Sequence, residues 1–516
     1  MRSINWLTTI SNRIRYASRR RRATRKLTGN RFTRVAGQVQ SEDVRAQPEG
    51  EFRESLWHSF DVTPRFTRDS RRFQRQMWNT SELAATPELL EDRTLLAATV
   101  DIVAGDLVVE DSIGTVADDW SFTADGTTLT ITDLSGNPID LLDELDGDAG
   151  DGTASVTILL SEFTGTLDIN TLGGDDVVTL GSLKLENNQS VDVDGGTDRD
   201  GANITGNVET TGTGSVTVST SSRISVKSGS SITTVNGGIS LSGNFATSTT
   251  GFFNGIDVDA ATISTSGSGA ISLSGKAGTS GDGVGVQIQN ASTVQSTATS
   301  SGGGITINGI GGGANAGGYG VQIKDVSTLV DSKSGAIQIT GQGGAQASSH
   351  GVFLTGGADI TSSDGTGAAT ITISANGGTG SSSAGLIITD VGSTISSIAG
   401  AIDITGTGAS ANDSGVVVSD GTIENPGAAT VTVSGSAVNG DAIVLQNAAQ
   451  IGDATGSGTI TLKGDEFTAS GTTVIDGQGA LVIEPVTAST TIGLGDGSGT
   501  LNLLDSELAF LSDGFS

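Results

Sequence analysis

The chain has 516 residues, of which 77 are glycine, and it contains no cysteine, six prolines and only 4% aromatic residues. The lack of cysteine excludes disulfides and thiolate metal sites, and only two histidines, His58 and His350, are present for zinc binding or catalysis. Residues 1–100 hold 19 of the 27 Lys and Arg residues but only 11 of the 57 Asp and Glu residues. The remaining 8 basic and 46 acidic residues give the body a charge of −38, which argues against nucleic acid as a partner.

Residues 1–98 are predicted to form a basic leader that is largely disordered or partly helical. Apolar residues between Ile4 and Ile14 recur near one helical face, and four consecutive arginines follow at 19–22. A secretory signal needs an apolar run of about 7–15 residues after the charges, and the leader has none. We interpret the segment as a solvated basic arm, with contact to an anionic membrane surface as the alternative.

The leader ends in a leucine-rich stretch, 89–98, that resembles the LEPR-XLL motif of large exported bacterial surface proteins. The residues that carry this resemblance are Leu90, Glu91, Arg93, Leu95 and Leu96. Asp92 stands where the motif has proline. The resemblance implies sorting to the cell surface through export machinery that reads the leader. Cleavage is expected near Ala97–Ala98, where small residues follow an apolar pair and the charge changes abruptly. A short helix that buries its leucines is the alternative interpretation.

Residues 99–205 are predicted to form an acidic β region in which short strands alternate with Asp/Gly turns. Closely spaced carboxylates on such turns can bind calcium, although 146–157 lacks the glutamate of an EF-hand and no nonapeptide repeats in tandem. Two interpretations stay open, namely turn chemistry alone and weakly bound Ca²⁺ as the one cofactor. The candidate calcium ligands are Asp146, Asp148, Asp151, Asp175, Asp176, Asp194, Asp198 and Asp200.

Residues 206–486 are predicted to be a β-solenoid with repeats of about 29–34 residues. The signature Ile-x-Ile/Leu-x-Gly, with small variations, starts at Ile239, Ile271, Ile305, Ile337, Ile371, Ile402, Val431 and Ile460. Two further apolar pieces follow in most repeats, so stacking gives continuous inner columns, while Ser and Thr face outward. The predicted fold class is therefore all-β, a right-handed parallel β-helix, with its variable loops on one side. A propeller is disfavoured because no aromatic residue recurs in register.

Catalysis is weighed because some β-helix proteins are polysaccharide lyases or hydrolases. His350 and Lys324 faintly resemble the His-Gly and basic elements of polygalacturonases, but no pair of aspartates is evident on neighbouring repeats. The histidine is therefore expected to be a solvated loop residue, and the protein is expected not to be an enzyme. A carboxylate cluster that spans adjacent coils would favour the enzyme instead.

Residues 487–516 resemble a recurrent segment of filamentous-haemagglutinin-like repeat proteins and are expected to start a further, truncated repeat, as in a fragment of a longer protein. The combined features predict an exported, extracellular or cell-surface protein with a structural or adhesive role. Its partners would be polymers or cells outside the cell. The alternatives are a carbohydrate-active β-helix enzyme and a calcium-dependent exported protein.

Overall fold

The computed structural model describes residues 97–142, 148–364, 369–495 and 497–516. The chain divides into two units, Met1–Pro87 and Glu88–Ser516, and every described residue belongs to the second. The five residues of the sorting motif and Asp146 lie outside the described residues.

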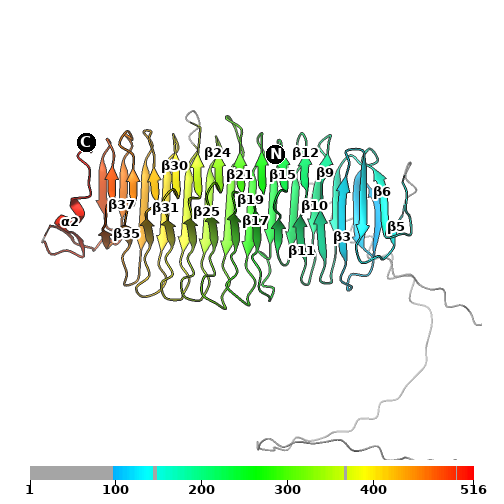
Figure 1. The fold of residues 1–516 in the computed structure, drawn as a ribbon, viewed down its shortest axis with the longest axis horizontal. Helices are drawn as coiled ribbons and strands as arrows, with labels where there is room; N and C mark the ends of the chain where they lie inside the picture. The colour runs from blue at the N-terminus through cyan, green and yellow to red at the C-terminus, as the bar shows by residue number, and fades with distance from the viewer. Residues whose placement is uncertain (1–96, 143–147, 365–368, 496) are drawn as a thin grey trace, which may run out of the picture. The chain divides into compact units, whose positions relative to one another are not determined.

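The described part of the chain is a parallel β-helix, which confirms the predicted fold class (Figure 1). Three strands make one coil, and each strand pairs with the equivalent strands of the coils before and after it. The first complete coil consists of β7 (Thr166–Asn170), β8 (Val177–Leu180) and β9 (Leu183–Leu185). We call the sheets that contain these strands sheets A, B and C. Within the described residues they have 15, 14 and 11 strands.

From β7 onward, successive strands of the three sheets belong in turn to sheets A, B and C. Sheet A also contains β1 (Ala98–Val103), β2 (Asp106–Asp111), β5 (Ile139–Leu141), β10 (Ser190–Asp194), β13 (Val216–Thr220), β16 (Ile239–Gly243), β19 (Ile271–Lys276), β22 (Ile305–Ile310), β25 (Ile337–Gln342), β28 (Ile371–Asn376), β31 (Ile402–Thr407), β34 (Val431–Ser436), β37 (Ile460–Lys463) and β40 (Leu481–Glu484). Sheet B also contains β3 (Asp119–Ala124), β4 (Thr128–Asp133), β6 (Ser155–Leu159), β11 (Gly201–Ile204), β14 (Ile224–Val226), β17 (Ile256–Asp259), β20 (Val286–Gln289), β23 (Val321–Lys324), β26 (Val352–Thr355), β29 (Leu386–Thr389), β32 (Val416–Ser419), β35 (Ile443–Gln446) and β38 (Phe467–Ala469). Sheet C also contains β12 (Asn207–Thr210), β15 (Ser231–Thr234), β18 (Thr262–Thr265), β21 (Thr293–Ser296), β24 (Leu329–Ser332), β27 (Asp359–Ser362), β30 (Thr394–Ser397), β33 (Thr422–Glu424), β36 (Gln450–Gly452) and β39 (Val474–Asp476).

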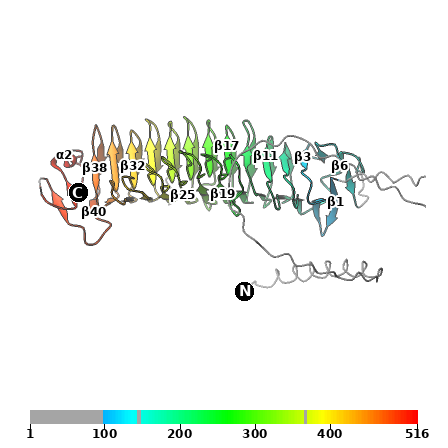
Figure 2. The same cartoon turned by 90° about the horizontal axis from the view of Figure 1, so that it is seen from below.

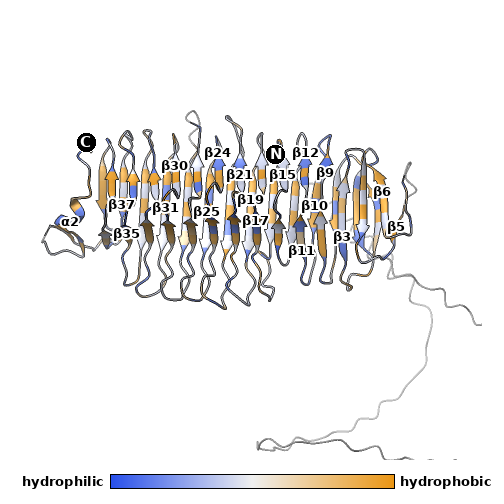
Figure 3. Cartoon of the chain, viewed as in Figure 1, coloured by the Kyte–Doolittle hydropathy of each residue, from blue (hydrophilic) through white to orange (hydrophobic). Residues whose placement is uncertain are grey.

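The core is a set of apolar columns that run through the stacked coils. Ile271, Ile305, Ile337 and Ile371 are register partners along sheet A, and each is at most 1% exposed. This confirms the predicted inner column. The residues between them point to the opposite face of each strand, so apolar and polar colours alternate along the strands in Figure 3. Burial of each isoleucine side chain contributes about 1.5–3 kcal/mol.

The corner between sheets B and C requires a left-handed backbone in every coil from β17 onward. The residues with positive φ there are Ala260 (47°), Asn290 (57°), Asp325 (78°), Gly356 (70°), Asp390 (74°), Asp420 (64°), Asn447 (60°) and Gly471 (76°). Gly, Asn and Asp adopt this conformation at the lowest cost, so the turn chemistry of the repeats follows directly from the corner geometry. Ala260 is the exception, because its Cβ is strained at positive φ.

The connections between sheets A and B change length along the stack. In the first three coils they span 171–176, 195–200 and 221–223, whereas in the next three they span 244–255, 277–285 and 311–320. These long connections lie along one edge of the helix, below the strands in Figure 1, as the sequence predicted. The connection 244–255 in the fourth coil therefore extends further from the strands than the connections of the first three coils. We call this change in connection length the step.

Regular coils begin at Thr166, inside the segment 99–205 that was predicted to be a separate acidic β region. Leu167 pairs with Val191, which pairs with Val216, so the first repeats are shorter than those that carry the isoleucine signature. Before them, β1 and β2 pair antiparallel, as do β3 and β4 and then β4 and β6. These strands cover the first coil and bury the large rings of Trp120 and Phe122.

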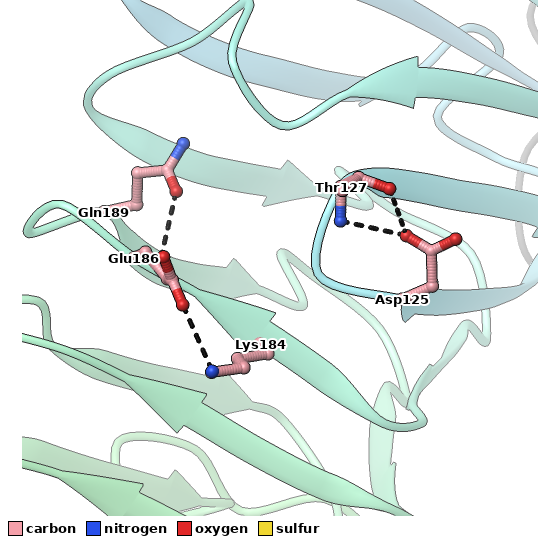
Figure 4. A network of polar contacts seen from close by, with 5 residues as sticks. All are labelled: Asp125, Thr127, Lys184, Glu186 and Gln189. Atoms are coloured by element: carbon pink, nitrogen blue, oxygen red, sulfur yellow. Dashed lines mark hydrogen bonds and ion pairs between the residues drawn. The ribbon is translucent and has the colours of Figure 1, made fainter.

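Gln189 ties this cap to the first complete coil. Its side-chain amide donates to the carbonyl oxygens of Leu160 and Phe163 at 2.8 Å each, and its Oε1 accepts the backbone N–H of Glu186 (Figure 4). Glu186 in turn forms an ion pair with Lys184 on β9. A buried glutamine with three hydrogen bonds thus fixes the turn between sheets C and A.

Residues 487–516 do not continue the three sheets, in contrast to the expected start of a further repeat. They form β41 (Ile492–Leu494), β42 (Leu501–Leu503) and the helical turn α2 (Asp505–Leu508), and the first two make a separate two-stranded sheet. Leu501 and Leu503 are buried in the same core as the coils, and α2 lies near β38 and β40 at the end of the stack (Figure 2). The segment therefore covers the last coil.

Candidate functional site

The two arginines that follow the leader, Arg199 and Arg223, line the same pocket. They are the only arginines in residues 101–516, a segment that is strongly acidic. The pocket has a volume of about 290 Å³, and Phe252 and Phe253 form another part of its wall. We call it the arginine–phenylalanine pocket. Sequence reasoning did not identify any of these four residues.

The pocket lies at the step between short and long connections. Arg199 belongs to the connection 195–200, and Arg223 is the last residue of 221–223, immediately before β14. Gly201 and Arg223 occupy equivalent positions, since Ala202 pairs with Ile224. The two phenylalanines come from the longer connection 244–255 of the following coil. Short connections thus supply the cations, and the first long one supplies the aromatic wall.

The long connection is held in place by Asn244, which is fully buried. Its amide nitrogen donates to the carbonyl oxygens of Lys276 and Ala277 at 3.1 and 3.2 Å, in the next coil. Its Oδ1 accepts from the Thr247 hydroxyl at 2.7 Å and from the Thr249 N–H at 3.0 Å. These bonds pre-organise the loop, so the aromatic wall does not have to be ordered when a ligand binds.

Two glycines make the close packing around the rings possible. Gly251 has a φ of 146°, and a Cβ there would lie 3.4 Å from the Arg199 guanidinium. A Cβ on Gly281 would lie 2.0 Å from the Phe252 ring. Arg199 Cζ is 5.8 Å from the centre of the Phe253 ring, which is only 6% exposed, so a cation–π contact orients the guanidinium. Phe252 remains 67% exposed at the pocket.

Neither guanidinium forms a close ion pair among the described residues, although Arg223 lies near enough to Asp257 to oppose the rise that burial causes in the pKa of that carboxyl. Within the described residues the ion pairs are Lys184–Glu186 and Lys463–Glu484. Asp175 lines the pocket but accepts the backbone N–H of Arg199 at 3.2 Å. A unit anion 4 Å from one guanidinium would gain about 4 kcal/mol at the effective dielectric constant of a protein surface, before its desolvation. The arrangement is therefore suited to an anionic group that also has an apolar face.

Three aspartates form a column at the A-to-B corner of the first coils. The Asp118 N–H donates to Asp176 Oδ1 at 2.8 Å, and the Asp176 N–H donates to Asp200 Oδ1 at 3.1 Å. The Asp200 N–H donates to the Ser221 hydroxyl at 2.8 Å. Burial raises the pKa of Asp118 and of Asp200 to about 7, and negative neighbours add to both shifts. Two of the calcium candidates, Asp176 and Asp200, thus hold the coils together.

The other calcium candidates are spread over several turns. Asp151 Oδ1 accepts the N–H of Leu141, and Asp194 Oδ1 accepts the N–H of Gly196. Asp198 is exposed at a φ of 79°, and Asp148 lies in a short segment after the gap at 143–147. Among the described residues no three His, Asp or Glu side chains are grouped to hold a metal ion. The hydrogen bonds fit turn chemistry, and calcium binding stays a prediction.

His350 is not the solvated loop residue that the sequence suggested. It is 8% exposed, its ring stacks on Tyr319 at a centroid distance of 5.4 Å, and its Nδ1 accepts the Ala384 N–H at 3.1 Å. Burial lowers the pKa of His350 to about 4. Tyr319 and His350 occupy equivalent positions in consecutive coils, because each stands two residues before a strand of sheet B. This equivalence in the sequence could have predicted that their rings stack.

Carboxylates of adjacent coils do meet on the outer face of sheet A. Asp168 and Asp192 are register partners on β7 and β10, and burial followed by repulsion from Asp168 raises the pKa of Asp192. Neither residue lines the arginine–phenylalanine pocket. The pair spans adjacent coils, which is one of the features expected of a carbohydrate-active enzyme. That the protein is not an enzyme therefore stays a prediction.

No protein-family model, curated protein or solved structure matches this chain. The resemblances noted for the leader and for residues 487–516 therefore remain expectations from short motifs. In the described part of the chain, no helix has the length and apolar character needed to cross a membrane.

Proposed function

We propose that this protein is an exported β-helix of the cell surface that has a structural role and adheres to extracellular polymers. The observation that carries the proposal is the arginine–phenylalanine pocket on the side of a continuous coil stack. Both arginines lie in an acidic segment, and neither forms a close ion pair among the described residues. Their presence beside an exposed ring is better explained by a ligand that supplies the missing negative charge.

The coil stack gives the pocket a stiff support. Eleven strands of sheet C lie in succession, so complete coils spaced about 4.8 Å apart span about 50 Å. Each coil contacts its neighbours through backbone hydrogen bonds and apolar columns, which makes the stack resistant to bending. Such a support holds a binding site at a defined distance from an attachment point.

The proposed location rests on the leader. Its basic arm and the motif residues between Leu90 and Leu96 support recognition by an export system, and the partners are then polymers or cells outside the cell. Calcium at the millimolar concentration found outside cells is proposed only as a weak additional ligand of the acidic first coils.

The test is a comparison of surface exposure and adhesion. Intact source cells are treated with proteinase K, and antibodies against residues 97–516 then report whether the chain is degraded while a cytoplasmic marker survives. Beads coated with the full chain are applied to the same cells, with Arg199→Ala/Arg223→Ala beads as the matched control. We expect degradation at the surface and retention of the native beads alone. A chain that is protected in intact cells would refute the proposal.

A further inference from the structure

We infer that the arginine–phenylalanine pocket binds a single anionic sugar residue of an extracellular polysaccharide. This inference rests on the adhesive role proposed above and assigns its ligand class. The volume of about 290 Å³ is at the lower limit of small-molecule pockets and matches one sugar ring rather than an extended chain. The carboxylate of a uronic acid and the sulfate of a sulfated sugar share the required chemistry.

The charge of the ligand follows from the two guanidinium groups. Arg199 and Arg223 present planar forks that match a carboxylate or sulfate with two parallel hydrogen bonds. Asp175 also lines the pocket, and it would repel an anion placed above it. The anionic group is therefore expected between the two guanidiniums. Asp175 Oδ1 accepts the Arg199 N–H, so its Oδ2 is the expected acceptor for a sugar hydroxyl.

The sugar ring follows from the aromatic wall. The Phe253 ring is not accessible to a sugar, because it is buried and Arg199 lies over it. Phe252 is 67% exposed, and its ring is positioned by contact with Gly281 in the next coil. A large exposed aromatic ring offers an apolar platform. The C–H face of a sugar ring fits this platform, while Asn203 supplies an amide for its hydroxyl groups.

Competing ligands are less consistent with the surroundings. A nucleic acid would place many phosphates beside a body of charge −38, so its polyanionic chain would be repelled even if one nucleotide fitted. A neutral glycan would leave both guanidinium groups without an anionic partner. These two classes therefore serve as the contrasting outcomes of the test.

The test is isothermal titration of the full chain with trigalacturonate and with its fully methyl-esterified form, which has the same rings without the charges. A sulfated dextran oligosaccharide distinguishes sulfate from carboxylate recognition, and a short single-stranded oligonucleotide tests the nucleic-acid alternative. We expect binding of at least one anionic saccharide that weakens between about 50 and about 300 mM salt, because ions screen an exposed charge contact. The methyl ester should not bind.

Variants connect the binding to the pocket. Arg199→Ala and Arg223→Ala should each weaken binding about tenfold, since each removes a charge-assisted contact. Arg199→Lys should recover only part of the loss, because lysine keeps the charge but not the fork. Phe252→Ala should weaken binding about fivefold, and Phe252→Tyr should restore it. Lys333→Ala removes one positive charge outside the pocket and should change affinity by less than about twofold.

The inference is overturned if neither anionic saccharide binds, if the methyl ester or the oligonucleotide binds as tightly as they do, or if the arginine variants bind as tightly as the native chain. Arg199, Arg223 and Phe252 are exposed and Lys333 is half-buried, so the variants are expected to fold. Circular dichroism and thermal melting of each variant check that the coils are intact. If native and variant beads adhere to cells equally, the sugar assignment fails while the adhesive role stands. If the chain is not at the surface, the proposed function fails whatever the titration shows.

Discussion

Replacing Asp200 with asparagine tests whether the buried aspartate column destabilises the protein at alkaline pH. The Asp200 side chain is 1% exposed, and burial raises its pKa from 3.8 to about 7, with Asp176 and Asp198 as negative neighbours. In the unfolded chain the group loses its proton near its ordinary value. Between these two values the folded form binds more protons, so its stability falls as the pH rises through the window from about 4 to about 7.

The substitution Asp200→Asn mimics the protonated acid. Its Oδ1 can still accept the Asp176 N–H, and its amide can donate to the Ser221 hydroxyl, which faces Asp200 Oδ2 at 3.0 Å. A pKa rise from 3.8 to about 7 corresponds to about 4 kcal/mol at high pH. Solvent screening reduces this value, and we expect the variant to gain about 1–3 kcal/mol at pH 8.

The assay is urea unfolding followed by circular dichroism at pH 4.5 and at pH 8. At pH 4.5, which lies about 0.7 above the ordinary value of 3.8, the gain should be about a quarter of its full value, and at pH 8 it should be complete. Asp194→Asn, at an exposed site in the preceding strand, is the matched control and should give the same small change at both pH values. A destabilised Asp200→Asn at pH 8, or a gain that does not depend on pH, would refute the reasoning.

Four other expectations can be checked with similar measurements. Ile337→Asp places an unpaired charge in the sheet A column and should cost several kcal/mol, whereas Gln338→Ala on the outer face should cost less than about 0.5 kcal/mol; an unchanged urea midpoint for Ile337→Asp would contradict the column. Ala260→Asn supplies the residue type found at the equivalent corners of other coils and should raise stability by about 0.5–1 kcal/mol, and a lowered midpoint would show that the corner is not strained. Calcium at ten times its dissociation constant should stabilise the chain by about 1.4 kcal/mol per site, and identical melting curves with calcium and with chelator would leave the aspartates as turn residues. Because Ala97 and Ala98 are at most 3% exposed in the folded chain, cleavage should occur either at a position N-terminal to Ala97 or at a time before the chain folds. N-terminal sequencing of surface-extracted protein checks this, and a chain that still begins at Met1 would refute processing.

The coil stack could be predicted from the sequence because its signal is local and periodic. Ile305 and Ile337 carry the same short signature, and the register follows from aligning one copy with the next. The first coils were missed because their period is shorter and their inward residues, such as Leu167 and Val191, stand in a different pattern. The period lengthens only after Ile239, where the connection from sheet A to sheet B first becomes long. The predicted boundary at residue 206 therefore falls among the short coils.

The pocket could not be predicted because it depends on connection lengths in several coils at once. Arg199 and Phe253 are separated by 54 positions in the chain, and they meet only because one connection is long where the preceding ones are short. The composition does contain a signal that was not used, because Arg199 and Arg223 are the only arginines in residues 101–516. Which of the many surface residues would face them was not encoded in any local motif.

In-register stacking also has a consequence for how such a chain can change its length. Residues 305–336 make up one complete turn, so deleting them would bring Ile337 onto Ile271 in the position that Ile305 now occupies. Duplication of the same stretch would add one turn in the same way. The reach of the molecule can therefore grow or shrink in steps of about 4.8 Å through simple tandem gains and losses of DNA. The sugar-binding surface inferred between residues 175 and 253 would be carried along unaltered.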